Sequence, residues 1–220
     1  MQQVVKLVSL LALAWVGVLV WAMWQIPLTD SGLQILALEQ LANSGVDSGV
    51  TAVLLNYRAY DTLLEVIVLL AAVLGARAAG WPVALPLNAD RGPLLPGVVS
   101  LLLPLLLLSA VYLLWLGKYE AGGSFQAGAL LGAAGILALL SAGTGEWPVR
   151  TWVVRAGLIV GFSVFLLIGL LVIPITGTFL TYPLHLATTL IVLIEIVLAF
   201  SIGLALLLLF AGEGSVVDPP

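Results

Sequence analysis

LHLATTLIVLIEIVLAFSIGLALLLLF, residues 184–210, is apolar except for His185 near its start, Glu195 near its middle and a few hydroxyl-bearing side chains. A bilayer core about 30 Å thick is crossed by roughly 20 apolar residues in a helix. Because this stretch is longer than that, it predicts a transmembrane helix that is tilted or that continues beyond the membrane.

The rest of the chain has the same character. Of its 220 residues, 62% are hydrophobic and 8% are charged, and the mean hydropathy is +1.23. This composition excludes a soluble domain and predicts an all-α, polytopic membrane helix bundle. The length suffices for about six transmembrane helices, expected at residues 4–24, 61–79, 94–116, 124–142, 151–173 and 184–210.

Composition also excludes several functions. The chain has no cysteine, so it can supply no disulfide, thiolate metal ligand or iron–sulfur cluster. Its net charge of -4 and its dispersed basic residues argue against nucleic-acid binding. With no nucleotide or redox motif, we expect no metal, no cofactor and no enzymatic activity in this chain.

Three segments outside the expected spans carry information about domain organisation. Residues 25–51 predict a short amphipathic helix, and residues 46–56 predict a second short or re-entrant helix that is buried in protein. Residues 81–93 are rich in proline and glycine and read as a linker. We therefore expect a two-span module at 1–85 and a four-span module at 86–220.

The basic residues predict the orientation. With six spans, five basic residues lie on one side of the membrane and two on the other. The five are Lys6, Arg77, Arg91, Arg150 and Arg155, and the two are Arg58 and Lys118. The positive-inside rule then places both termini in the cytoplasm. We expect the protein to lie in the cell's inner (plasma) membrane.

Arg58, Asp61 and Glu65 stand at the mouth of the second span. Their spacing of three and four positions places them on one face of a helix, where a cation and two carboxylates form a candidate ion or proton site. Alternatively, Asp61 and Thr62 cap the helix. Glu65 lies a full turn into the apolar run, and we expect it to face protein or water.

Four further features of the sequence bear on function or packing. Glu195 is a lone carboxylate deep in the last span, where it would be protonated unless it meets a cation; it suits a proton relay or an interhelical hydrogen bond equally well. His185 is either a proton-relay group or an ordinary interfacial histidine. Gly122 and Gly123 predict a tight structural turn at the membrane interface, and Gly128 with Gly132 predicts close helix contact.

Three stretches resemble the Mrp-type multisubunit sodium/proton antiporters. Residues 43–75 resemble the segment related to the carboxy-terminal part of their large A subunit, with Leu64 in place of a glycine; the matching residues are Arg58, Asp61, Thr62, Leu63 and Glu65. Residues 101–132 resemble the opening of the B subunit, although its Gly-His and Pro-Gly-Gly-Gly-Phe elements are altered at positions 118, 121 and 124. Residues 174–181, with Glu195 and Gly203, resemble its end.

The resemblance implies a fused ion-transport subunit that packs beside larger proton-channel subunits. In it, Asp61, Glu65 and Glu195, with Arg58, would bind or relay Na⁺ or H⁺. Two alternatives remain open: a structural scaffold whose charges pair with neighbouring subunits, and a membrane subunit of an energy-converting, complex I-related oxidoreductase such as a membrane-bound hydrogenase. The altered positions leave the transported ion open.

Overall fold

The computed structural model describes residues 2–25, 33–80, 94–142 and 150–212. Within these ranges the chain forms helices and no strand. In chain order the helices are α1 (Gln2–Trp24), α2 (Leu33–Glu39), the 3₁₀ helix η1 (Leu41–Asn43), α3 (Gly49–Ala52), the π-helix η2 (Val53–Tyr57), α4 (Ala59–Ala78), α5 (Leu94–Leu116), α6 (Ser124–Ala142), α7 (Thr151–Thr176) and α8 (Leu184–Ala211).

The chain divides into two compact units, residues 1–36 and residues 37–220. The first unit contains α1, whose apolar side chains, such as those of Leu13 and Trp24, are exposed. The second unit contains the helix bundle and all residues of the candidate site.

Five helices of the described ranges, α4 to α8, are long and apolar enough to cross a membrane. The apolar part of α1, Ser9–Trp24, is shorter. The predicted all-α, multi-pass bundle is confirmed, with five such helices described against the expected six. The predicted linker at 81–93, which contains the expected module boundary near residue 85, lies outside the described residues.

One expected helix end is wrong. The fifth span was expected to stop before Pro174, but α7 continues through it to Thr176. Proline removes one backbone donor and strains a helix, but helices that span membranes tolerate it where neighbouring groups satisfy the freed backbone carbonyl. The helix ends instead at Gly177, which adopts a left-handed conformation (φ 78°) and donates its N–H to the Ile173 carbonyl at 2.8 Å.

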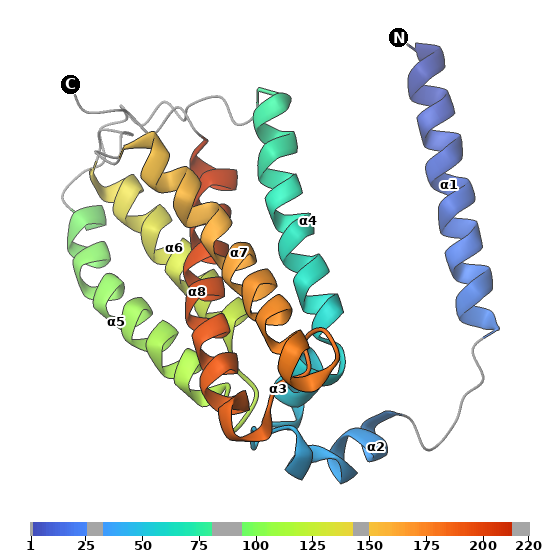
Figure 1. Cartoon of the computed structure of the whole chain (residues 1–220). Helices are drawn as coiled ribbons and strands as arrows, with labels where there is room; N and C mark the ends of the chain where they lie inside the picture. Colours follow the sequence, from blue (N-terminus) through green and yellow to red (C-terminus); the bar gives the residue numbers. More distant parts are fainter. Residues whose placement is uncertain (1, 26–32, 81–93, 143–149, 213–220) are drawn as a thin grey trace. The chain divides into compact units, whose positions relative to one another are not determined.

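Helix α8 is the most buried helix of the bundle. It packs against α6 and α7, while α5 covers α6 and α4 contacts both α7 and α8 (Figure 1). The expected close helix contact is confirmed, because a Cβ at Gly128 would lie 2.8 Å from Ile202 Cβ and one at Gly203 would lie 2.9 Å from Leu131 Cβ. Small residues on both helices thus bring α6 and α8 together.

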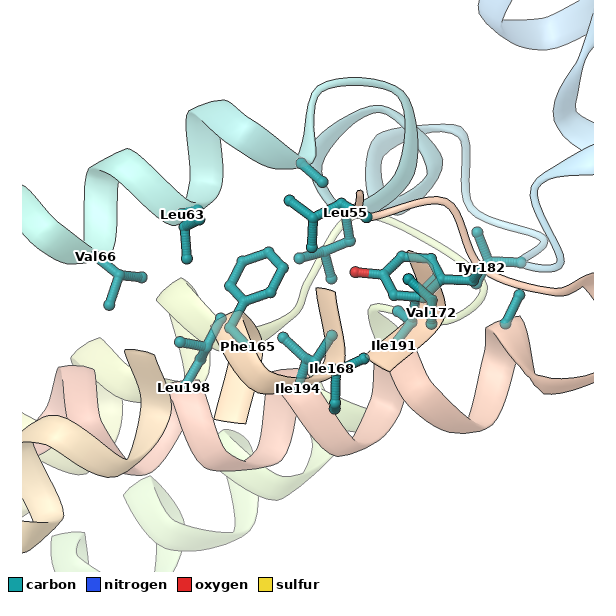
Figure 2. Packing of buried hydrophobic residues seen from close by; sticks show 14 of the residues in the cluster. Leu55, Leu63, Val66, Phe165, Ile168, Val172, Tyr182, Ile191, Ile194 and Leu198 are labelled. Atoms are coloured by element: carbon teal, nitrogen blue, oxygen red, sulfur yellow. The ribbon is translucent and has the colours of Figure 1, made fainter. Parts of the chain in front are cut away.

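The main apolar cluster joins α4, α7 and α8 to the short helices before α4. Leu63 and Val66 of α4 point toward Phe165 and Leu198, and Leu55 of η2 lies at the same cluster (Figure 2). Residues 46–56 were expected to form a short or re-entrant helix buried in protein. α3 with η2 confirms the short helix, which is buried at Thr51, Ala52 and Leu55 and exposed at Val50 and Leu54. We call residues 44–57 the re-entrant segment.

Candidate functional site

Arg58 and Asp61 are brought together, as their spacing predicted. Arg58 lies between η2 and α4, and its Nη2 forms an ion pair with Asp61 Oδ2. The two side chains are 61% and 44% exposed, so the pair lies on the surface of the chain. Asp61 occupies the first turn of α4, where the helix dipole favours a negative charge.

The alternative that Asp61 and Thr62 cap this helix is wrong. The N-cap of α4 is Arg58, and no side chain makes a capping hydrogen bond there. Thr62 is buried, and its hydroxyl donates to the Leu54 carbonyl at 2.6 Å. This bond ties the first turn of α4 to η2.

Glu65 lies on the outward side of α4. Leu63 and Val66 fill the core, whereas Leu64, Glu65 and Val68 are exposed. Within the described ranges Glu65 makes no ion pair or hydrogen bond. The described part of the bundle therefore offers this carboxylate no partner.

Glu195 lies inside the bundle and is 3% exposed. It stands roughly 16 Å from the start of α8 at 1.5 Å per residue, and the shorter helix α6 begins beside it. The backbone N–H of Ser124, the first residue of α6, donates to its carboxylate. Glu195 thus occupies the kind of position that favours anions, the amino end of a helix.

The turn before α6 lies in close contact with this carboxylate. A Cβ at Gly123, which has φ 108°, would lie 2.5 Å from Glu195 Oε1. The Leu113 carbonyl accepts the N–H groups of both Gly117 and Gly123, at 3.1 and 3.0 Å, so the turn folds back on itself. The predicted tight turn at Gly122 and Gly123 is present, and both glycines are buried: Gly122 faces Leu113 and Gly117, and Gly123 faces Glu195 of α8.

His185 is separate from both groups. It is exposed in the first turn of α8. No cluster of histidine, aspartate and glutamate that could hold a metal ion occurs in the described part of the chain. The structure therefore contains two distinct charged sites, the outward pair with Glu65 on α4 and the buried Glu195.

Several polar residues at these sites escaped the sequence reasoning. Ser124 supplies the donor to Glu195, and Ser48 and Thr51 tie the re-entrant segment to the turn before α6. Ser124 directly follows a glycine pair and starts an apolar helix, which is a signal for a helix start but not for the contact with Glu195. Ser48 and Thr51 carry no comparable signal, because their partners lie far away in the sequence.

Comparison with known proteins gives one family and two similar structures. A family model described as a domain related to the MnhB subunit of Na⁺/H⁺ antiporter matches residues 94–213. A chain in the structure of the Mrp complex from Dietzia sp. DQ12-45-1b matches with a TM-score of 0.62 and 26% identity, covering 100% of this chain and 26% of that one. The chain thus spans about a quarter of the length of that relative.

The second structure is the membrane-bound sulfane sulfur reductase (MBS), an archaeal respiratory membrane complex. A chain of it matches with a TM-score of 0.62 and 24% identity, covering 92% of this chain and 96% of that one. At this identity the match supports the fold alone. No curated protein matches the chain.

Proposed function

Because the chain belongs to the family of domains related to the MnhB subunit of Na⁺/H⁺ antiporters, we propose that it is a membrane subunit of a multisubunit cation/proton antiporter. In this role it contributes carboxylates to a path for Na⁺ or H⁺ and packs against larger proton-channel subunits. It is a transport subunit and carries out no covalent chemistry.

The buried Glu195 is the observation that carries this proposal. It lies within the part of the chain that the family model matches, near the middle of a membrane-spanning helix. Ionisable groups at such a depth are costly and typically mark ion or proton pathways. The hydrogen bond from Ser124 N–H occupies one acceptor position of the carboxylate. The other positions can take a proton or an ion.

Glu65 supports the second half of the proposal, packing against other subunits. It projects from an apolar helix with no partner among the described residues. A carboxylate facing lipid at this position would be unfavourable, so a polar or charged group from a neighbouring subunit, or an ion held between the subunits, faces it. Glu65 and the Arg58–Asp61 pair would then lie at a subunit interface.

The exposed ion pair also favours a second candidate function, a structural subunit in a related energy-converting membrane complex. In that case the charges of Arg58 and Asp61 hold subunits together and transport no ion. Neutralising Arg58 would then cause loss of assembly, whereas an ion-path role predicts assembled complexes with impaired transport.

Measuring ion transport by assembled complexes distinguishes the ion-path subunit from the structural subunit. We expect Glu195→Gln and Glu65→Gln to lower cation-driven proton movement in reconstituted vesicles at least about tenfold, because each removes an ionisable group from the path. Glu120→Gln is the matched control, since Glu120 is exposed on the turn before α6. Unchanged transport in both variants, with normal subunit composition, would refute the ion-path role.

A further inference from the structure

We propose that Glu195 also acts as a positioning residue, which fixes the re-entrant segment and, through it, the Arg58–Asp61 pair. Glu195 contacts the turn before α6, residues 117–123. That turn accepts hydrogen bonds from Ser48 and Thr51. The importance of this linkage for ion movement rests on the function proposed above, but the linkage itself can be tested without transport.

The first step joins Glu195 to the turn. Its carboxylate accepts the Ser124 N–H and contacts Gly123 so closely that any side chain there would collide with Oε1. A Cβ at Gly117 would likewise lie 2.7 Å from Gly123 N, and one at Gly122 would lie 2.5 Å from Leu113 O. The turn and the carboxylate are thus in close contact, and glycines at these positions make the approach possible.

The second step joins the turn to the re-entrant segment. Three consecutive bonds use backbone carbonyls of the turn as acceptors: Ser48 N–H donates to Lys118 O at 3.0 Å, Ser48 Oγ donates to Glu120 O at 3.0 Å, and Thr51 Oγ1 donates to Gly117 O. Ser48 and Thr51 are both buried. Because buried polar groups are costly to leave unpaired, these bonds fix the segment to the turn.

The third step joins the segment to the charged pair. Ser48 caps α3, with its Oγ accepting Thr51 N–H at 3.3 Å, and α3 continues directly into the π-helix η2. Arg58 N–H closes η2 by donating to Val53 O at 2.8 Å, and Thr62 ties α4 back to Leu54. Single-turn π-helices within helices often occur at functional sites, and this one ends at the ion pair.

A second anchor shows which part of the segment depends on Glu195. At its beginning, the Gly45 carbonyl accepts the Thr188 hydroxyl, and a Cβ at Gly45 would lie 2.5 Å from Ala187 Cβ. This anchor uses the first turn of α8 and does not involve Glu195. Loss of the Glu195 contact should therefore loosen residues 48–58 and leave residue 45 in place.

Hydrogen exchange in the intact complex tests the linkage. Gly123→Ala places the new methyl group against Glu195 Oε1 and also strains the backbone at φ 108°; we expect amide exchange of residues 48–58 and 124 to rise about tenfold or more, the effect of losing one buried hydrogen bond. Glu195→Ala removes the acceptor without a clash and should raise exchange at the same amides. Glu120→Gln, on the exposed side of the turn, should leave them unchanged.

A double-mutant cycle separates positioning from general loosening. Glu195→Asp shortens the side chain and makes room for the methyl group of Gly123→Ala, so the double variant should exchange more slowly than the two single effects predict. Gly132→Ala, which strains the contact between α6 and α8 away from the turn, is the structural control; it should not act selectively on residues 48–58.

The proposal is overturned if Glu195→Ala and Gly123→Ala leave exchange at 48–58 unchanged, if Gly132→Ala reproduces their pattern, or if the double variant is merely additive. A failure of the transport role leaves a different signature. In that case the exchange pattern holds while Glu65→Gln and Glu195→Gln transport normally.

Discussion

Tyr182 precedes α8 in a loop and carries a buried hydroxyl that has no hydrogen-bond partner in the described part of the chain. Its ring lies in the main apolar cluster near Val172 and Ile191 (Figure 2). Burial raises the pKa of Tyr182, so the hydroxyl stays protonated. A buried donor without a partner loses its hydration and gains nothing in return.

Tyr182→Phe should therefore stabilise the protein by about 1 kcal/mol, because it removes the unpaired hydroxyl and keeps the ring. Denaturant unfolding in detergent measures the change. Tyr57→Phe is the matched control, since the Tyr57 hydroxyl donates to Gln40 O at 2.5 Å and its removal should not stabilise. A destabilised Tyr182→Phe variant would mean that the hydroxyl has a partner in the assembled protein.

Sequence reasoning at the residue scale succeeded where partners are near in the chain. The spacing of Arg58 and Asp61 predicted that they share one face of a helix, and the two side chains form an ion pair. It could not find the donor to Glu195, because Ser124 lies on another helix and nothing in either segment encodes the contact. It also could not decide whether Glu65 or Glu195 is buried, since each is a carboxylate in an apolar run and only packing selects the face.

At the scale of elements, one side chain joins α7 to α8. Ser201 is buried in α8; its hydroxyl donates to Gly157 O at 2.7 Å and accepts Gly161 N–H at 2.9 Å. A Cβ at Gly161 would lie 2.7 Å from Ser201 Oγ, so the glycine makes this approach possible. Polar side chains that bond across helices are a common means of association in membranes.

Ser201→Ala should lower the free energy of unfolding by about 1 kcal/mol, since it removes both interhelical bonds but leaves the packing intact. Thermal unfolding in detergent gives the comparison. Ser100→Ala serves as the control, because the Ser100 hydroxyl donates within α5 to Gly97 O and is exposed. An equal effect of the two substitutions would contradict a special role of the α7–α8 contact.

The long helices were predictable because a membrane span must be continuous and apolar. The bounds of α5 and α6 agree at both ends with the hydropathy pattern. The end of α7 does not follow from Pro174, because the helix continues through this proline and ends at Gly177. The form of the re-entrant segment could not be predicted, since bonds from the distant carbonyls of Gly117 and Lys118 hold it.

At the scale of the whole molecule, successive long helices of the second unit run in opposite directions (Figure 1). Arg77 at the end of α4 and Arg150 and Arg155 at the start of α7 therefore lie at one end of the bundle, where α8 also ends. Arg58 and Lys118 lie at the other end. This distribution supports the proposal that the end of α8 faces the cytoplasm.

Reporter fusions test this orientation. A reporter that works only in the cytoplasm should be active when fused after residue 220 and inactive when fused after Thr178, in the loop between α7 and α8. The two fusions differ by one transmembrane helix, so each controls for the expression of the other. Activity in the reverse pattern would show that the bundle has the opposite orientation.

The π-helix η2 has a consequence for insertions and deletions. Since α4 follows it directly, the number of residues in η2 sets which α4 residues face the core. Each residue turns an α-helix by about 100°, so one deletion in 53–57 would move Val66 into the outward place of Glu65 and bring Ile67 into the core. A change in the length of this five-residue stretch should therefore disrupt the packing of α4 against the core.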